Sequence, residues 1–237
     1  MPDESTRLSK VVAALVPCSR REAEQYITEG WVRVDGQVVD APQARVTGQR
    51  VEVDAKAHLQ PPVPATVLLH KPPGMPGREA LASIGAGTRW TGDTTGIVRV
   101  KSHAVGLAED LPLPDAASGL VVFSQDGRVV RKLQEDANLL EQELVAEVAG
   151  TPPPHGLARL QRGLVFEGWA LPPARVSWQS ETRLRFAVKG IRPDLVPWMC
   201  EQVGLRVTAL RRLRIGRVPL AGLPVGQWRY LAPGEKF

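Results

Sequence analysis

The sequence predicts an α+β protein in which a small N-terminal helix–hairpin domain precedes a larger domain built on a mixed, largely antiparallel sheet. The chain has 237 residues, of which 43% are hydrophobic and 23% charged, so it is long enough for two domains with separate cores. Beyond residue 65, strand-like segments follow one another with few helical segments between them. This order is typical of antiparallel sheets in α+β proteins.

Composition divides the chain into three parts. Residues 1–55 are expected to form the first domain, which ends in the strand Val51–Val53. Residues 56–65 contain three prolines and few side chains to bury, which favours an extended linker. Residues 66–237 are expected to form the second domain. The linker prolines limit the reach between the domains but do not fix their orientation.

The first domain is predicted from a helix and a hairpin between residues 19 and 39, preceded by a helix at Arg7–Lys10. Ser19 and Glu22 have the spacing of a capping box, which satisfies two backbone N–H groups at a helix start. Gly30 ends that helix, because glycine adopts positive φ easily. Asp35-Gly36 lies between two short apolar runs and predicts a tight hairpin turn.

Basic residues at the start of the second predicted helix indicate an anionic partner. Arg20 and Arg21 lie in its first turn, where positive charge opposes the helix macrodipole. A phosphate backbone lying across the helix start would explain them, whereas two solvated arginines are the alternative. Residues 1–55 hold seven Arg/Lys and nine Asp/Glu, a net charge of −2, so binding would depend on a local patch. The residues predicted to contact the backbone are Arg7, Lys10, Ser19, Arg20, Arg21 and Arg33.

The second domain is predicted from its apolar runs. Val67–Leu69 and Leu120–Phe123 are expected as buried strands, and a helix at Arg128–Asp136 follows the second. Residues 74–114 have weak periodicity and are expected to form short strands and loops. The remaining predicted elements, in order, are a strand at 143–148, a helix at 157–162, paired strands at 175–178 and 183–188, a helix at 197–203, and strands at 207–215 and 228–231.

The densest basic segment lies near the end of the chain. Leu205–Arg217 contains five arginines and no acid. The chain beyond residue 55 has a net charge of +7, which together with −2 for residues 1–55 gives the total of +5. A solvated strand face usually mixes signs, so we expect Arg211, Arg212 and Arg214 to face phosphates. An ordinary solvated face is the alternative.

Several classes of protein are not expected. No apolar run approaches the roughly 20 residues that span a bilayer, and the acidic start is unlike a signal peptide, so we expect a cytoplasmic monomer. Cys18 and Cys200 are far apart and are expected as free, buried thiols. The four histidines are scattered and lack ligand partners, so no metal site is expected.

Two parts of the sequence resemble known families. The helix–hairpin resembles the alpha-L RNA-binding module, named after a small-subunit ribosomal protein. The second domain resembles the catalytic domain of the small-ribosomal-type pseudouridine synthases, the family of RsuA, RluB, RluE and RluF. The resemblance covers nearly the whole chain except roughly residues 75–105. The segments that carry it are Leu68–Gly74, Ser118–Gly127, Met199–Gly204, Leu213–Gly216 and Gly226–Leu231.

The resemblance implies a specific chemistry and also shows where this chain departs from it. The family uses one aspartate on the sugar, without cofactor or metal, after the target uridine is flipped out of its helix. Aligned on Ser118–Leu120, the family motif Gly-Arg-Leu-Asp-x-x-Thr-Ser-Gly-Leu places its arginine on Pro112 and its aspartate on Pro114. The family's pocket tyrosine falls on Leu144, and its second-shell arginine falls on Asp194.

We therefore interpret the chain as an RNA-binding protein with the fold of a pseudouridine synthase and a decayed isomerase site, bound to structured RNA such as ribosomal RNA. One alternative is an active isomerase that uses Asp115, one residue past the expected position, or more remotely Asp110. Asp115 could also be a solvated loop acid. A further alternative is a scaffold that binds a protein partner in ribosome assembly.

Overall fold

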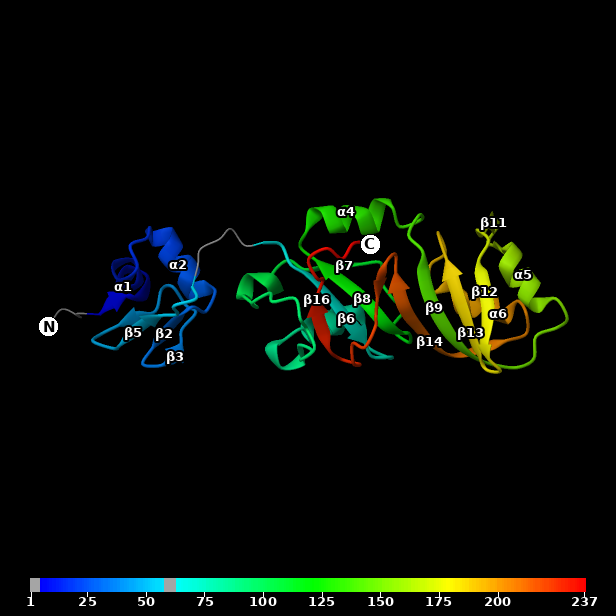
Figure 1. Cartoon of the computed structure of the whole chain (residues 1–237), viewed down its shortest axis with the longest axis horizontal. Helices are drawn as coiled ribbons and strands as arrows, with labels where there is room; N and C mark the ends of the chain where they lie inside the picture. Colours follow the sequence, from blue (N-terminus) through cyan, green and yellow to red (C-terminus); the bar gives the residue numbers. More distant parts are fainter. Residues whose placement is uncertain (1–4, 58–62) are drawn as a thin grey trace. The chain divides into compact units, whose positions relative to one another are not determined.

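The computed structural model describes residues 5–57 and 63–237, in two compact units (Figure 1). The first comprises the described residues up to Val63 together with Val98–Gly106, and the second comprises Pro64–Ile97 and Leu107–Phe237. The sequence places residues 98–106 in the second domain, whereas the structure groups them with the first unit. Residues 58–62 of the predicted linker lie outside the described residues.

The first unit contains two helices, α1 (Leu8–Leu15) and α2 (Arg20–Thr28). The predicted capping box is confirmed, because the Ser19 hydroxyl accepts a hydrogen bond from the Glu22 N–H while the Glu22 carboxylate accepts one from the Ser19 N–H. Arg7 is the residue before α1, so this helix begins one residue later than predicted.

The hairpin after α2 is also confirmed. Asp35 and Gly36 have φ angles of 49° and 81°, which suit a tight two-residue turn. Strand β2 pairs with β3 and β5 in a three-stranded sheet, while β1 pairs with β4. The bounds are β1 Thr6–Arg7, β2 Val32–Val34, β3 Gln37–Val38, β4 Arg45–Val46 and β5 Val51–Val53.

The second unit is built on a nine-stranded sheet in the order β12-β13-β9-β14-β8-β6-β16, with β7 on β8 and β15 on β14. Only the β14–β8 pair is parallel, so the predicted mixed, largely antiparallel sheet is confirmed. The strands are β6 Thr66–Lys71, β7 Ala108–Asp110, β8 Ser118–Ser124, β9 Gln142–Ala149, β12 Arg175–Ser180, β13 Arg183–Val188, β14 Arg206–Ile215, β15 Val218–Pro219 and β16 Trp228–Tyr230. A separate hairpin pairs β10 (Val165–Phe166) with β11 (Trp169–Ala170).

Four helices accompany this sheet: α3 (Gly77–Ala82), α4 (Gly127–Glu135), α5 (Gly156–Arg162) and α6 (Leu195–Glu201). Helix α3 lies in the segment predicted as strands and loops. Its six residues bury only one side chain, so they carry no helical periodicity for the sequence to show. Two short 3₁₀ turns, Ala86–Thr88 and Lys101–Ala104, complete this segment.

The two faces of the sheet bury different side chains. On β9 and β13, Leu144 and Phe186 point toward α5 and α6 and share a core cluster with Met199. On β8, Leu120 packs with Leu133 of α4 in a second cluster. The side of β12, β13, β9 and β14 that faces away from α5 and α6 therefore carries mostly polar side chains, as in many antiparallel sheets.

Gly119 explains why β8 and β14 can run side by side. Its φ is 112°, and a Cβ atom there would lie 2.2 Å from the carbonyl oxygen of Arg212 on β14. No larger residue fits so close an approach of two backbones.

Two expectations about the chain as a whole can be compared with the structure. Both cysteines are free, but only Cys200 is buried, whereas Cys18 is partly exposed at the end of the segment joining α1 to α2. Among the described residues, no helix has the length and apolar character needed to cross a bilayer.

Candidate functional site

The segment between β7 and β8, residues 111–117, holds the positions of the family motif. We call it the motif loop. Three charged side chains lie beside it: Lys71 from β6, Glu109 from β7 and Arg212 from β14. Each of these three strands pairs with β8, so residues far apart in sequence meet around one loop.

Lys71 fastens the motif loop to the turn that follows β6. Its side chain is fully buried, and its Nζ donates hydrogen bonds to the carbonyl oxygens of Met75 (2.8 Å), Asp115 (2.9 Å) and Pro72 (3.3 Å). Burial lowers the pKa of Lys71, while the nearby charges of Asp115 and Glu109 oppose that shift. The ammonium group thus links the backbone of the motif loop to the backbone of the turn after β6 through hydrogen bonds.

Arg212 holds the other end of the motif loop. It is completely buried and donates from Nη2 to the Leu111 carbonyl (2.8 Å), from Nε to the Leu120 carbonyl (2.8 Å) and from Nη1 to Gln142 Oε1 (2.9 Å). Burial lowers the pKa of its guanidinium, and the charge of Glu109 opposes this. The prediction that Arg212 faces phosphates is wrong, because its donors are already bonded inside the protein.

Glu109 supplies the negative charge that faces both buried cations. Burial raises the pKa of its carboxyl group, and Arg212 and Lys71 act in the opposite direction. The carboxylate packs closely against Gly77 at the start of α3, where a Cβ atom would lie 2.0 Å from Glu109 Oε2 and would displace it. Sequence analysis missed Glu109, since nothing local distinguishes it from a solvated acid.

Asp115, the predicted catalytic candidate, is held by its backbone only. Its carbonyl oxygen accepts hydrogen bonds from the N–H of Gly74 (2.7 Å) and from Lys71 Nζ. Asp115 is exposed, and its carboxylate makes no hydrogen bond with the described residues. Pro112 and Pro114 occupy the family's arginine and aspartate positions, and Pro112 is exposed as well. The structure therefore fixes the path of the loop without orienting the Asp115 carboxylate.

Two further family positions carry side chains of a different kind. Leu144 is completely buried in the core between Arg212 of β14 and Phe186 of β13. Asp194 is the residue before α6 and forms an ion pair with Arg192, whose hydrogen bond lowers the pKa of Asp194. Neither position supplies an aromatic ring or a cation to the motif loop.

Asp110, the remoter carboxylate candidate, points to the other side of β7. It is almost completely buried, and its Oδ1 accepts a hydrogen bond of 3.1 Å from Gln134 of α4. Burial raises the pKa of Asp110. This carboxylate belongs to the contact between β7 and α4.

The predicted basic patch of the first unit lies on its surface. All six of its residues are exposed, and Arg20 pairs with Glu24 at 3.3 Å across one helical turn. Ser19 is already engaged in the capping box. Within the described part of the chain, Arg7, Lys10 and Arg21 form no ion pair, so their charges are available to an outside ligand.

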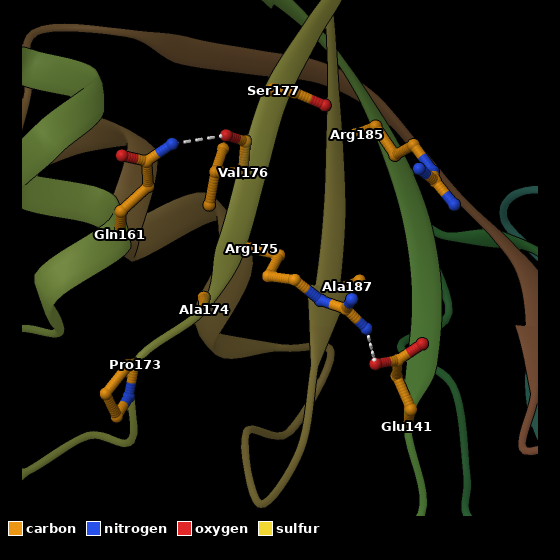
Figure 2. A pocket seen from close by; sticks show the side chains of 9 residues that line it. All are labelled: Glu141, Gln161, Pro173, Ala174, Arg175, Val176, Ser177, Arg185 and Ala187. Atoms are coloured by element: carbon orange, nitrogen blue, oxygen red, sulfur yellow. Dashed lines mark hydrogen bonds and ion pairs between the residues drawn. The ribbon is translucent and has the colours of Figure 1, made fainter.

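A pocket of about 560 Å³ opens beside β12, away from the motif loop (Figure 2). The pocket is lined by the start of β12 and the end of β13, which pair with each other, and Gln161 of α5 donates to the Val176 carbonyl at its edge. The residues that line it are Glu141, Gln161, Pro173, Ala174, Arg175, Val176, Ser177, Arg185 and Ala187.

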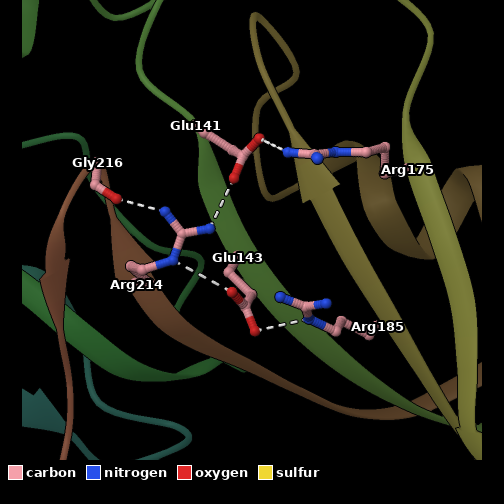
Figure 3. Close-up of polar contacts among 6 residues, drawn as sticks. All are labelled: Glu141, Glu143, Arg175, Arg185, Arg214 and Gly216. Carbon is pink, nitrogen blue, oxygen red and sulfur yellow. Dashed lines mark hydrogen bonds and ion pairs between the residues drawn. The ribbon is translucent and has the colours of Figure 1, made fainter.

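The other two predicted arginines of β14 differ from each other. Arg211 is exposed, and its contact with phosphate stays a prediction. Arg214 instead bridges Glu143 of β9 (3.1 Å) and Glu141, the residue before β9 (2.6 Å), and also donates to the Gly216 carbonyl (Figure 3). Arg214 is therefore paired with two acids, and its contact with phosphate also stays a prediction. Among the described residues, no three His, Cys, Asp or Glu side chains gather as metal ligands do.

Comparisons with known proteins cover both units. Residues 6–51 match the family model of the S4 domain. The chain is 31% identical to ribosomal large subunit pseudouridine synthase B of Bacillus subtilis (strain 168), over 97% of this chain and 93% of that protein. It is 28% identical to dual-specificity RNA pseudouridine synthase RluF of Escherichia coli (strain K12), over 99% of this chain and 78% of that protein. A crystal structure of a pseudouridylate synthase shares the fold, with a TM-score of 0.60, 20% identity and 96% coverage of both chains.

Proposed function

The chain belongs to the RsuA/RluB/RluF-type pseudouridine synthase family, and from this premise we propose that it binds structured RNA, ribosomal RNA in the first place, without isomerising it. The observation that carries the RNA-binding part is the exposed basic patch at the start of α2, within the segment that matches the S4 domain. We include in this proposal that the protein acts as a cytoplasmic monomer.

The patch suits a phosphate backbone for two reasons. First, α2 begins at a capped N-terminus, where the helix dipole favours a negative ligand. Second, Arg21 forms no ion pair with any residue that the structure describes, and Arg7 and Lys10 lie at the start of the neighbouring helix α1 in the same unit. Arginine and lysine side chains that no acid neutralises can position an RNA without reading its sequence.

The loss of isomerisation is supported by the residues around the motif loop. Pro114 has no carboxylate, and Pro112 has no cation to order one. Leu144 has neither a ring to stack on a flipped base nor a hydroxyl. Asp194 carries the wrong charge to pair with a catalytic carboxylate. A preorganised site of this type depends on all of these groups together.

The second candidate function is an active RNA pseudouridine synthase that uses Asp115. The names of the two relatives support it more directly than they support loss of activity, because both are called pseudouridine synthases. The Asp115 carboxylate also lies close enough to Lys71 to act on its charge, and its backbone is fixed by two hydrogen bonds.

Two measurements on the full-length protein separate the candidates. Affinity for a structured ribosomal RNA fragment is expected to fall steeply with salt, with a slope of about 0.7–0.9 per phosphate contact in a logarithmic plot. Salt-independent affinity would contradict RNA binding in both candidates. Pseudouridine in RNA from cells that carry the gene, absent from a deletion strain and from an Asp115→Asn strain, would favour the active enzyme.

A further inference from the structure

The second unit has an arginine-rich surface that no function assigned above uses. It is the side of β12, β13, β9 and β14 that faces away from α5 and α6. We call it the arginine face. Its charged residues are Arg175, Arg183, Arg185, Arg206, Arg211 and Arg214 together with Glu141, Glu143 and Glu147. Six arginines against three glutamates leave a surplus of three positive charges.

The charges on this face are sorted by strand. Glu143 and Glu147 lie on β9 and Glu141 directly precedes it, whereas the arginines lie on the strands to either side of β9. Arg183 pairs with Glu147 at 2.9 Å, and Arg185 pairs with Glu143 at 2.7 Å. Figure 3 shows how the β9 acids stand between Arg214 on one side and the arginines of β12 and β13 on the other. Opposite charges on neighbouring strands hold each other in register.

The glutamates hold the guanidinium groups in place but accept hydrogen bonds from only some of their N–H groups. Arg185 donates to Glu143 through Nε alone, and Arg175 donates to Glu141 through one Nη atom, so both retain free N–H groups. The side chains of Arg175, Arg183 and Arg185 are 77%, 57% and 43% exposed. Hydrogen bonds from Arg214 and Arg175 lower the pKa of Glu141, and hydrogen bonds from Arg185 and Arg214 lower the pKa of Glu143, which favours the ionised form of both acids.

Two arginines of β14 add positive charge that no acid among the described residues pairs with. Arg206 pairs in register with Ala149 and Arg211 with Val145, positions that alternate with the buried residues of β9. Both arginines are exposed, and within the described residues neither forms an ion pair. They extend the positive surface across β14, so it spans three strand spacings, about 15 Å.

The face is also hollowed where β12 and β13 meet. Figure 2 shows Arg175 reaching toward Glu141, and Arg185 and the Ser177 hydroxyl on the same strand pair at the pocket described above. A hollow with two guanidinium groups and a hydroxyl provides donors for one phosphate group. The remaining arginines lie beyond it on the same sheet.

We propose that the arginine face is a second RNA-binding surface, which contacts backbone phosphates while the first unit binds elsewhere on the same RNA. The proposal rests on the proposed RNA-binding function. Guanidinium groups match phosphate oxygens in pairs, and contacts to backbone phosphates position an RNA without selecting a sequence. A surface about 15 Å wide with its charge distributed over four strands fits an extended polyanion better than a single small ligand.

The test compares two triple variants of the full chain that lose the same charge. Arg175→Gln/Arg206→Gln/Arg211→Gln removes exposed arginines from the face, and the control Arg128→Gln/Arg131→Gln/Arg162→Gln removes exposed arginines elsewhere in the second unit. We expect the first variant to bind a structured ribosomal RNA fragment about tenfold more weakly, with a salt slope lower by about two to three. The control should keep both values.

A single substitution that removes a negative charge from the arginine face provides an independent test. Glu147→Gln removes the acid that pairs with Arg183, so it should raise RNA affinity severalfold. If the ion pair served only to stabilise the fold, its loss would not raise the affinity.

Equal affinities and salt slopes in the wild type and in the first triple variant would overturn the proposal. If the first triple variant unfolds, Arg206→Gln and Arg211→Gln are tested singly, since neither loses an ion pair, and each must lower the slope by about one. Absence of salt-dependent binding by the wild type would instead overturn the proposed function itself.

Discussion

Lys71 Nζ donates a hydrogen bond of 2.9 Å to the carbonyl oxygen of Asp115, so the candidate aspartate is bound through its backbone and not through its carboxylate. With Arg212 bonded to the Leu111 carbonyl, two buried cations determine the path of the motif loop. The two cations therefore fix the path of the motif loop, whereas no hydrogen bond within the described residues orients the Asp115 carboxylate.

Replacing Arg212 should destabilise the second unit strongly. Arg212→Met removes three hydrogen bonds and leaves Glu109 beside a single cation, so the free energy of unfolding should fall by about 3–5 kcal/mol. Urea unfolding measures this change. Arg211→Gln, at the neighbouring exposed position, is the matched control and should stay within about 0.5 kcal/mol of the wild type. Equal effects of the two substitutions would show that the buried contacts do not form.

The basic patch of the first unit should control RNA affinity without affecting stability. Arg20→Gln/Arg21→Gln is expected to weaken binding of a ribosomal RNA fragment and to lower the salt slope by about two, because each lost phosphate contact releases one counterion fewer. Filter binding at several salt concentrations measures both quantities. Arg50→Gln, an exposed arginine of the same unit that pairs with Glu52, should leave the slope unchanged. An unchanged slope in the double variant would exclude α2 from the interface.

The acids of β9 should make the second unit sensitive to low pH. Hydrogen bonds from Arg185 and Arg214 lower the pKa of Glu143 below its ordinary value of 4.5. A carboxyl group whose pKa is lower in the folded state stabilises the fold above the unfolded-state pKa and loses this effect as pH falls through the folded-state value.

The corresponding experiment compares Glu143→Gln with the wild type by urea unfolding between pH 3 and pH 7. At pH 7 the variant should be less stable by about 1–3 kcal/mol, and the difference should shrink as the pH falls below 4.5. Glu181→Gln, in the exposed turn after β12, provides the control. A difference that stays constant over this range would mean that the ion pairs with Glu143 contribute nothing.

Much of the fold could be predicted because its signals are local. The capping box at Ser19, the Asp35-Gly36 turn and the apolar runs of β6 and β8 each specify their structure within a few residues. Helix α3 could not be predicted in this way, since one buried residue in six leaves no pattern.

The burial and pairing of the β14 arginines depend on residues that are distant in the sequence. Simple alternation would place Arg212 and Arg214 on the same side of the strand, but the register with β9 shifts between them. One is therefore buried among carbonyl oxygens, and the other is paired with acids about 70 positions earlier in the chain. A list of arginines in one segment does not contain this information, which comes only from the pairing of strands.

The most direct measurement is the pseudouridine content of ribosomal RNA incubated with the purified full-length protein. Pro114 stands at the place of the family's aspartate, and no hydrogen bond within the described residues orients the Asp115 carboxylate. We therefore expect the RNA to be bound but to contain no more pseudouridine than RNA incubated alone. A rise in pseudouridine with the wild type that is absent with Asp115→Asn would contradict the proposed loss of isomerisation and identify the reacting carboxylate.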